Sequence, residues 1–221
     1  DSRGTGQLAR SIASHLSATY PLSGIIRHQL FFDPRVPYTK NNSSAAILLH
    51  TANDADLPAI FQQVKELMLA DFQPGSDPGL CVADAQAAGA LLEFGRKVQQ
   101  DVVNQSLARQ FAIQAGVLLE GLGGSQDGII GALAAVGLAA GGEDGRYILV
   151  GQSRQLSGLL PVQALIAAGI TEICTLDGKP VHDGIIKADK LRPARRGGKP
   201  VQYVQGAQEY WEPLKLDGQI D

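Results

Sequence analysis

Apolar residues recur at two spacings along the first 150 residues, and each spacing predicts one kind of element. A spacing of four residues, as for Leu8, Ile12 and Leu16, predicts a helix. Short runs of β-branched or large apolar residues that end at proline or glycine predict strands. The expected helices cover residues 7–16, 56–71, 83–98, 104–115 and 129–140, and the expected strands cover residues 23–32, 45–49, 117–120 and 146–150.

The pattern changes in the C-terminal segment, residues 151–221. Two short β-like stretches, 172–176 and 201–204, are interrupted by glycine and proline, and residues 160–168 have a helical pattern. Helices and strands that alternate along a chain favour a layered fold in which helices cover a sheet. The sequence therefore predicts an α/β to α+β fold with a mixed sheet.

The domain organisation is predicted from loop composition. The loop at residues 73–79 (QPGSDPG) is rich in turn-forming residues and is the best candidate boundary. We expect one domain formed by residues 1–75 and part of 76–150, and a smaller α+β unit at about 151–221. The chain starts at Asp1, inside a loop that leads directly into a helix, so we expect upstream residues that include a strand.

Composition narrows the class of protein. Of the 221 residues 44% are hydrophobic, which is typical of a globular chain rather than a disordered one. The net charge of −3 lacks the basic excess that backbone contacts with nucleic acid require. Two cysteines far apart in sequence, Cys81 and Cys174, exclude a structural zinc site and suit a reducing cytoplasm. The longest weakly polar run, 128–142, is too short to span a bilayer.

A glycine-rich segment, EGLGGSQDGIIG at residues 120–131, is the most informative motif. A strand is expected before it and a helix after it, so free N–H groups at the helix start could face an anion. Its spacing matches neither of the two common phosphate-loop patterns. A tight turn with close helix packing remains the alternative. The candidate nucleotide-binding residues of this loop are Gly121, Gly123, Gly124, Asp127 and Gly128.

A second glycine loop, Gly4-Thr5-Gly6, also precedes a helix. Alone it is equally well explained by helix capping, with Thr5 as the N-cap. Two such loops in one chain could hold a polyphosphate together, because a nucleotide site often gathers phosphate contacts from several loops. The geometric consequence is that both loops must face one cleft.

The segment at residues 33–44 follows the end of an expected strand and is stiffened by two prolines. Ligands tend to bind at strand ends of α/β sheets. Arg35 and Lys40 would suit phosphate oxygens, and Asn42 would suit a ribose or a base edge. A solvated loop without a ligand is the alternative.

A basic cluster at residues 192–199 (RPARRGGK) offers an RNA or nucleotide phosphate contact, with a solvated hairpin turn as the alternative. The histidines are scattered, and no Ser-His-Asp or Cys-His arrangement is recognisable. Each histidine is therefore expected to be structural. These residues are Arg192, Arg195, Arg196 and Lys199 in the cluster, and His15, His28, His50 and His182 elsewhere.

Three segments in order resemble motifs of the archaeal tRNA-isoleucine agmatinylcytidine synthetases. Residues 1–6 are similar to the end of an acidic D-D-T-D-S loop, and residues 33–42 (DPRVPYTKNN) are similar to N-P-N-x-P-W-K-T-R-G-N. Residues 127–137 (DGIIGALAAVG) closely resemble G-x-G-R-G-x-I-G-A-x-A-A-I-G. The resemblance implies a kinase-like α/β domain that uses ATP and a smaller ferredoxin-like α+β domain. The zinc ribbon and OB-fold of that family find no counterpart, and Asp127 stands in place of the family's arginine.

The resemblance implies ATP and Mg²⁺ as cofactors, and an ATP-dependent phosphotransferase or ligase acting on an unidentified small substrate. Asp1, with acidic residues upstream, would hold the metal, and Lys40 or Arg35 would neutralise charge that develops in transfer. A non-catalytic nucleotide- or metabolite-binding module is the alternative, and RNA modification through the cluster near Arg195 is a third reading. We expect a cytoplasmic protein with nucleotide and small-molecule partners, neither nucleic acid nor membrane, and leave homo-oligomerisation open.

Overall fold

The computed structural model describes residues 4–36, 42–51 and 53–216. The helices are α1 (Thr5–Leu16), α2 (Leu57–Ala70), α3 (Ala85–Ala90), α4 (Leu92–Gln100), α5 (Gln105–Ala115), α6 (Gly128–Gly141) and α7 (Val162–Ala167). The strands are β1 (Leu22–Gln29), β2 (Ser43–Leu49), β3 (Gly79–Val82), β4 (Leu118–Gly121), β5 (Arg146–Leu149), β6 (Leu159–Pro161), β7 (Glu172–Cys174), β8 (Ile185–Lys187), β9 (Ala194–Arg196), β10 (Lys199–Gly206) and β11 (Trp211–Pro213).

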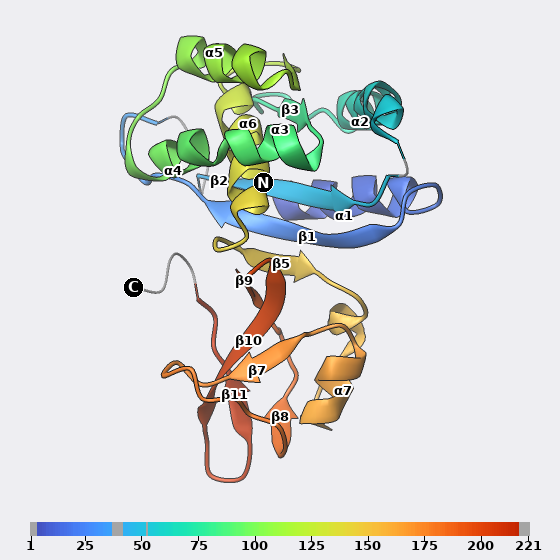
Figure 1. Cartoon of the computed structure of the whole chain (residues 1–221), viewed down its shortest axis with the longest axis vertical. Coiled ribbons are helices and arrows are strands. Elements are labelled where there is room, and N and C mark those ends of the chain that lie inside the picture. Colours follow the sequence, from blue (N-terminus) through green and yellow to red (C-terminus); the bar gives the residue numbers. More distant parts are fainter. Residues whose placement is uncertain (1–3, 37–41, 52, 217–221) are drawn as a thin grey trace.

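One mixed sheet runs through the molecule (Figure 1). Its strand order is β2-β1-β5-β9-β10-β11-β8-β6, and β7 pairs in parallel with β10. Strands β3 and β4 form a separate antiparallel pair in the upper part of the view. The expected mixed sheet with helices is confirmed.

Two helices cover opposite faces of the β1–β2–β5 part of the sheet. Because side chains alternate along a strand, neighbouring residues of β1 point to opposite faces. Ile25 packs against Ala9 and Ala13 of α1, whereas Ile26 packs against Ala135 and Ala139 of α6. The sheet is therefore buried on both sides in this region.

Helix α6 is the centre of the N-terminal part. It is apolar all round, with Ile129, Leu133 and Leu138 almost completely buried. Its small residues allow other elements to approach closely: a Cβ at Gly137 would lie 2.2 Å from the carbonyl oxygen of Leu91. Figure 1 shows the helix running from the level of β3 down to the sheet. Helix α6 thus fixes the spacing between these layers.

The C-terminal part has its own hydrophobic cluster. Buried residues from 162 to 204, including Leu165, Ile170 and Ile186, pack together, and the other clusters contain residues before 151. The sheet nevertheless continues between the two parts, because Arg146 of β5 pairs with Ala194 of β9. The division into two domains near residue 150 stays a prediction, which the separate clusters favour.

Local differences from the expected elements have physical causes. The expected helix at 83–98 is two helices, because the chain turns at Leu91 between α3 and α4. Strand β3 was not predicted; it follows directly after the loop at 73–79. That loop connects α2 to β3, which pack against each other. None of the described helices has the length and apolar character needed to cross a membrane.

Candidate functional site

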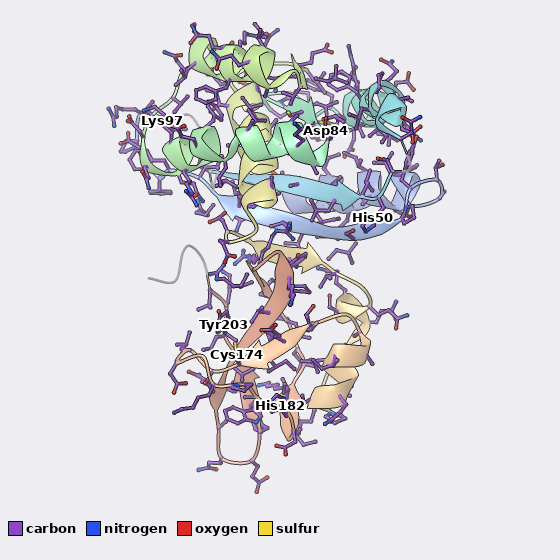
Figure 2. The ribbon with its side chains drawn as sticks, viewed as in Figure 1. His50, Asp84, Lys97, Cys174, His182 and Tyr203 are labelled. Atoms are coloured by element: carbon purple, nitrogen blue, oxygen red, sulfur yellow. The ribbon has the colours of Figure 1, made fainter. Side chains whose placement is uncertain are left out.

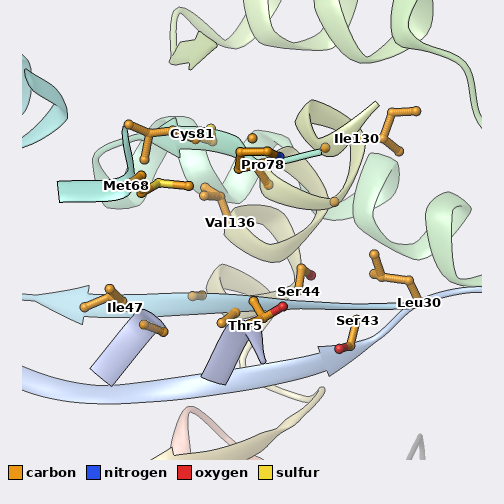
Figure 3. A pocket seen from close by; sticks show the side chains of 18 of the residues that line it. Thr5, Leu30, Ser43, Ser44, Ile47, Met68, Pro78, Cys81, Ile130 and Val136 are labelled. Atoms are coloured by element: carbon orange, nitrogen blue, oxygen red, sulfur yellow. The ribbon is translucent and has the colours of Figure 1, made fainter. Parts of the chain in front are cut away.

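A cleft of about 2260 Å³ lies between β2 on one side and α2 and β3 on the other, and α6, which packs against β2, also lines it. Figure 3 shows Ser44 of β2 on one side of it, with Cys81 of β3 and Val136 of α6 on the other. Side chains from both faces of β2 line the cleft, including Ser44 from one face and Ile47 from the other. The cleft therefore follows the free edge of this strand, which has a hydrogen-bonded neighbour, β1, on its other side.

The sequence-predicted loops meet at this cleft. Thr5 at the start of α1, Arg35 and Asn42 from the segment after β1, and Asp127 and Gly128 at the start of α6 all contribute to its lining, as does Gly124. The structure thus places residues of all three loops on one cavity. Their contact with a nucleotide stays a prediction. Lys40 and Asp1 fall outside the described residues.

The start of α6 is held by a cluster of polar side chains. The Ser125 hydroxyl lies 2.5 Å from Asp77 Oδ2 and 2.8 Å from Asp127 Oδ2. Asp77 Oδ2 also accepts a hydrogen bond from the backbone N–H of Asp127, at 3.1 Å. Gln105 Nε2 donates to Asp127 Oδ1 and to the carbonyl of Ser125, both at 2.8 Å. We call Asp77, Ser125 and Asp127 the acidic cluster.

Two features of the acidic cluster matter chemically. A hydroxyl has one proton, so Ser125 can donate to one of its two carboxylate neighbours at a time. Asp77 Oδ1 is buried and has no hydrogen-bond partner among the described residues. The helix N-terminus is therefore occupied by negative charge, and a phosphate would need a cation between itself and these carboxylates.

The glycines of the 121–128 loop have packing roles in the structure. A Cβ at Gly128 would lie 2.0 Å from the carbonyl oxygen of Asp77, so α6 touches the backbone that leads into β3. At Gly121 a Cβ would lie 2.6 Å from Gln126, and at Gly123 it would lie 2.5 Å from the Phe72 ring. Neither of these two glycines lines the cleft. Close packing, the alternative weighed from the sequence, explains them.

The start of α1 differs from the expectation in one respect. The N-cap is Gly4, whose backbone is extended, and Thr5 is the first helical residue without a capping hydrogen bond. The expected N-cap role of Thr5 is therefore wrong. Gly6 faces away from the cleft, because a Cβ there would contact Ile148 and Arg10. Thr5 is the residue of this loop that reaches the cleft.

Arg35 and Asn42 already have protein partners. Arg35 forms two hydrogen bonds of 2.8 Å with the carboxylate of Asp33, although its side chain is 68% exposed. These bonds lower the pKa of Asp33 to about 2 and raise that of Arg35. Asn42 Nδ2 donates to the carbonyl of Phe31. Arg35 could share its guanidinium with a phosphate, whereas the Asn42 amide holds the strand end.

The basic cluster near Arg195 is structural at its centre. The Arg195 guanidinium donates to the carbonyls of Ala139 and Gly198 and to the Tyr147 hydroxyl, and lies 5.9 Å from the Tyr147 ring centroid. It joins α6 to the β9–β10 hairpin. These contacts leave Arg195 little capacity to bind RNA.

Histidine and cysteine side chains do not converge on a catalytic arrangement. Figure 2 shows His50 near the edge of the upper sheet, and Cys174 and His182 far below it. Both cysteines are free thiols, and burial raises the pKa of Cys81 to about 12. His28 instead pairs with Asp144 inside the protein, with Nδ1 and Oδ2 2.6 Å apart. No group of three or more metal-binding His, Cys, Asp or Glu side chains occurs in the described part of the chain.

The sequence did not single out Asp77 or Ser125. Asp77 belongs to the loop at 73–79, which composition marks as a turn, and it meets Ser125 from 48 residues away. The signal that could have identified Asp77 is an acidic residue next to the glycines of a turn. Its pairing with the start of α6 depends on the tertiary fold.

The structure is a mixed α/β fold with a cleft along the free edge of β2. No family model matches the sequence, and no curated protein is detectably related to it. Similarity is found among solved structures, at 22–24% sequence identity. At this identity the similarity establishes the fold.

The similar structures are of the tRNA agmatidine synthetase TiaS and of a tRNA fluorescent labeling enzyme. Apo TiaS matches with a TM-score of 0.51 at 22% identity, and TiaS in complex with its isoleucine tRNA and ATP with 0.52 at 24%. The labeling enzyme matches with a TM-score of 0.53 at 24% identity. Each match covers 62% of this chain and 33% of the other. The resemblance seen in the sequence is confirmed as a shared fold.

Proposed function

We propose that the cleft binds ATP with Mg²⁺, and that the chain is an ATP-dependent phosphotransferase or ligase. The observation that carries the proposal is the convergence of three loops on one cleft whose polar end contains the acidic cluster. The fold shared with TiaS, which was solved as a complex with ATP, supports it. The acceptor is a small molecule that the site does not identify.

The acidic cluster fits a magnesium ion. Mg²⁺ is usually bound by one or two carboxylates together with substrate phosphates, and it keeps several waters. Asp77 and Asp127 supply the carboxylates, and the partnerless Asp77 Oδ1 is a free ligand atom. When bound, Mg²⁺ would neutralise phosphate charge. Asp1, expected from the sequence to hold the metal, remains a proposed ligand.

The protein's own groups would orient the nucleotide. The start of α1 presents Thr5 and its helix N-terminus to the cleft, and Arg35 lies on the cleft lining. Arg35 would exchange part of its contact with Asp33 for a phosphate oxygen. Apolar residues along β2, such as Ile47 in Figure 3, line the rest of the cleft and would exclude water from it.

The charge of the acidic cluster gives a specific test. ATP without a divalent cation should bind weakly, because two carboxylates at the α6 start repel phosphate. ATP with Mg²⁺ should raise the melting temperature, since stabilisation grows as RT ln(1 + [L]/Kd). Thermal unfolding with ATP, with MgCl₂ and with both separates these cases. Equal shifts with ATP alone and with Mg-ATP would contradict the metal assignment.

Two variants locate the site. Asp127→Asn should reduce the shift with Mg-ATP, and Asp183→Asn should keep it, because Asp183 is exposed in the C-terminal part. An Asp127→Asn protein that binds Mg-ATP as well as the parent would remove the acidic cluster from the proposal.

The alternative function is a binding module without catalysis. Release of ADP or phosphate in the presence of candidate acceptors supports an enzyme, and binding without turnover supports the module.

RNA modification stays a third proposal: TiaS binds tRNA, but this chain covers a third of TiaS and has a net charge of −3. A cytoplasmic location and a homo-oligomeric state are also proposals, tested by fractionation and by light scattering.

A further inference from the structure

Two strands have an unpaired edge at the cleft. Strand β2 is the last strand of its sheet, and β3 pairs with β4, so in the described part of the chain each has a ladder partner on one side alone. Every residue of β2 and of β3 lines the cleft. Alternate backbone N–H and C=O groups of an edge strand point away from its paired neighbour. Two strands therefore present hydrogen-bonding groups to the same space.

Helices cover this space on both faces of the sheet. On β2, Ala46 packs against α6 and the next residue, Ile47, packs against α1. On β3, Leu80 packs with α2, whereas Cys81 packs against the cluster that contains α6. Figure 3 shows Met68 of α2 and Cys81 across the cleft from Ile47. The space between β2 and β3 is therefore a gap within the sheet layer, with helices above and below, and we call it the slot.

The side chains that line the slot are uncharged. The lining residues contributed by β2, β3, α1, α2 and α6 are apolar or small, apart from the hydroxyls of Thr5, Ser43 and Ser44. The charged lining residues Arg35 and Asp127 come from the loops. A strand that is buried on both faces is a nearly continuous run of hydrophobic residues. The slot suits such a run better than it suits a polar ligand.

We propose that the slot takes one added β-strand, an apolar segment joined in front of α1 in the same polypeptide, which pairs with β2 and β3 at once. Because β2 has seven residues and β3 has four, the added strand needs four to seven residues. It would join the β3–β4 pair to the main sheet. Its backbone would satisfy both free edges, and its side chains would bury apolar surface against the two helix layers.

The position of α1 favours a segment of the same chain over a separate peptide. Thr5, the first residue of α1, lines the cleft, so a strand that ends there leads directly into the helix. Helix α1 packs on β1 and β2 and is followed by β1. The added strand, α1 and β1 would form a crossover unit with parallel strands, with β2 between them. Since β1 and β2 are antiparallel, the added strand is antiparallel to β2.

The added strand and the proposed nucleotide use different parts of the cleft. The strand takes the apolar length of β2 and β3, whereas the nucleotide would contact Thr5, Arg35 and Asp127 at the loops. The inference therefore does not depend on ATP binding, and its test contains no nucleotide.

The test fuses a designed strand to the 221-residue chain. Six alternating valines and isoleucines are added directly in front of residue 1, and the matched control has proline at three alternate positions of the same segment. Proline keeps the segment apolar but removes N–H donors, so the control cannot complete both ladders. Hydrogen exchange followed by mass spectrometry reports on residues 43–49 and 79–82, with β10 as the internal reference. The reaction of Cys81 with a thiol reagent is measured in a Cys174→Ser background.

The fused strand should slow exchange at least tenfold in both β2 and β3, relative to the parent and to the proline control, and leave β10 unchanged. It should also raise the melting temperature and slow the reaction of Cys81 at least tenfold, because Cys81 lines the slot. Both effects should be absent from the control.

Unchanged exchange in β2 and β3 would overturn the proposal, and so would aggregation of the fused protein without protection of these strands. Protection of β2 without β3 would also overturn it, and a dimer in light scattering would then identify a second copy of the chain as the occupant of the β2 edge. Equal protection in the proline control would show that the segment covers the surface without pairing, which contradicts an added strand.

Discussion

Replacing Asp144 with alanine should expose how much the buried His28–Asp144 pair stabilises the fold. His28 has no exposed surface, and its Nε2 has no hydrogen-bond partner in the described part of the chain. Asp144→Ala removes the 2.6 Å contact to Nδ1, so both ring nitrogens would be buried without partners. An unsatisfied buried polar group costs about 1–3 kcal/mol, and His28 Nδ1 and the Gln99 amide both lose their bond to Asp144. We expect the free energy of unfolding to fall by about 3 kcal/mol at pH 7.

The loss should depend on pH in a defined direction. Burial acts to raise the pKa of Asp144, but hydrogen bonds from His28 and Gln99 outweigh it and hold the pKa below its ordinary value. A carboxyl with a lowered folded-state pKa stabilises the fold above its unfolded pKa, about 3.9, and stops doing so as pH falls through the folded value. The difference between parent and variant should therefore shrink below about pH 4.

Urea unfolding followed by circular dichroism measures both effects, provided that the slope with denaturant stays the same. Glu143→Ala is the matched control, because the neighbouring Glu143 is exposed and contacts the Gly197 N–H at the surface. A loss below about 1 kcal/mol for Asp144→Ala at pH 7, or an equal loss at pH 7 and pH 3, would refute the reasoning from the usual cost of leaving buried polar groups without partners.

Three further predictions follow from packing and burial. Gly128→Ala should lower the free energy of unfolding by about 3 kcal/mol, whereas Gly89→Ala, whose Cβ would meet no atom, should not; equal urea midpoints would contradict this. Cys81 should react with a thiol reagent at pH 7 much more slowly than Cys174, because burial raises its pKa to about 12; equal rates would show that β3 opens readily. Arg195→Met should cost about 2–3 kcal/mol in a chemical denaturation assay and leave RNA affinity unchanged, and a selective loss of RNA affinity would restore the RNA reading.

The sequence predicted most helices and the central strands because their patterns are local. Helix α2, expected at 56–71 and found at Leu57–Ala70, has one apolar face, which is visible in any window of the sequence. Helix α6 was visible for the same reason, as a run of small and apolar residues after a glycine loop. Both patterns depend on neighbours within four residues.

The misses depend on contacts that the sequence does not show. Asp84 caps α3 by accepting from the Ala87 N–H, which starts a helix two residues later than its apolar pattern suggests. Strand β3 is four residues long and depends on pairing with β4, about forty residues away. Neither the start of α3 nor strand β3 can therefore be predicted without the tertiary fold.

The sequence indicated three loops that line the cleft, and their role in binding a nucleotide stays a prediction. The glycines near the α6 start were identified correctly as unusual, but the structure explains Gly121, Gly123 and Gly128 by packing. The acidic cluster joins Asp77 to Ser125 and Asp127 across about fifty residues. A search for motifs of contiguous residues therefore cannot show that these three side chains lie together.

The central position of α6 also sets the order in which this protein can fold during synthesis. The helix packs against β2, β3, α3 and α4, all of which precede it in the chain. These elements cannot complete their shared core until residue 141 has been made, because α6 forms the middle of it. Contacts over such sequence separations slow folding, and the nascent chain exposes apolar surface in the meantime. The N-terminal elements should therefore depend on chaperones until α6 leaves the ribosome.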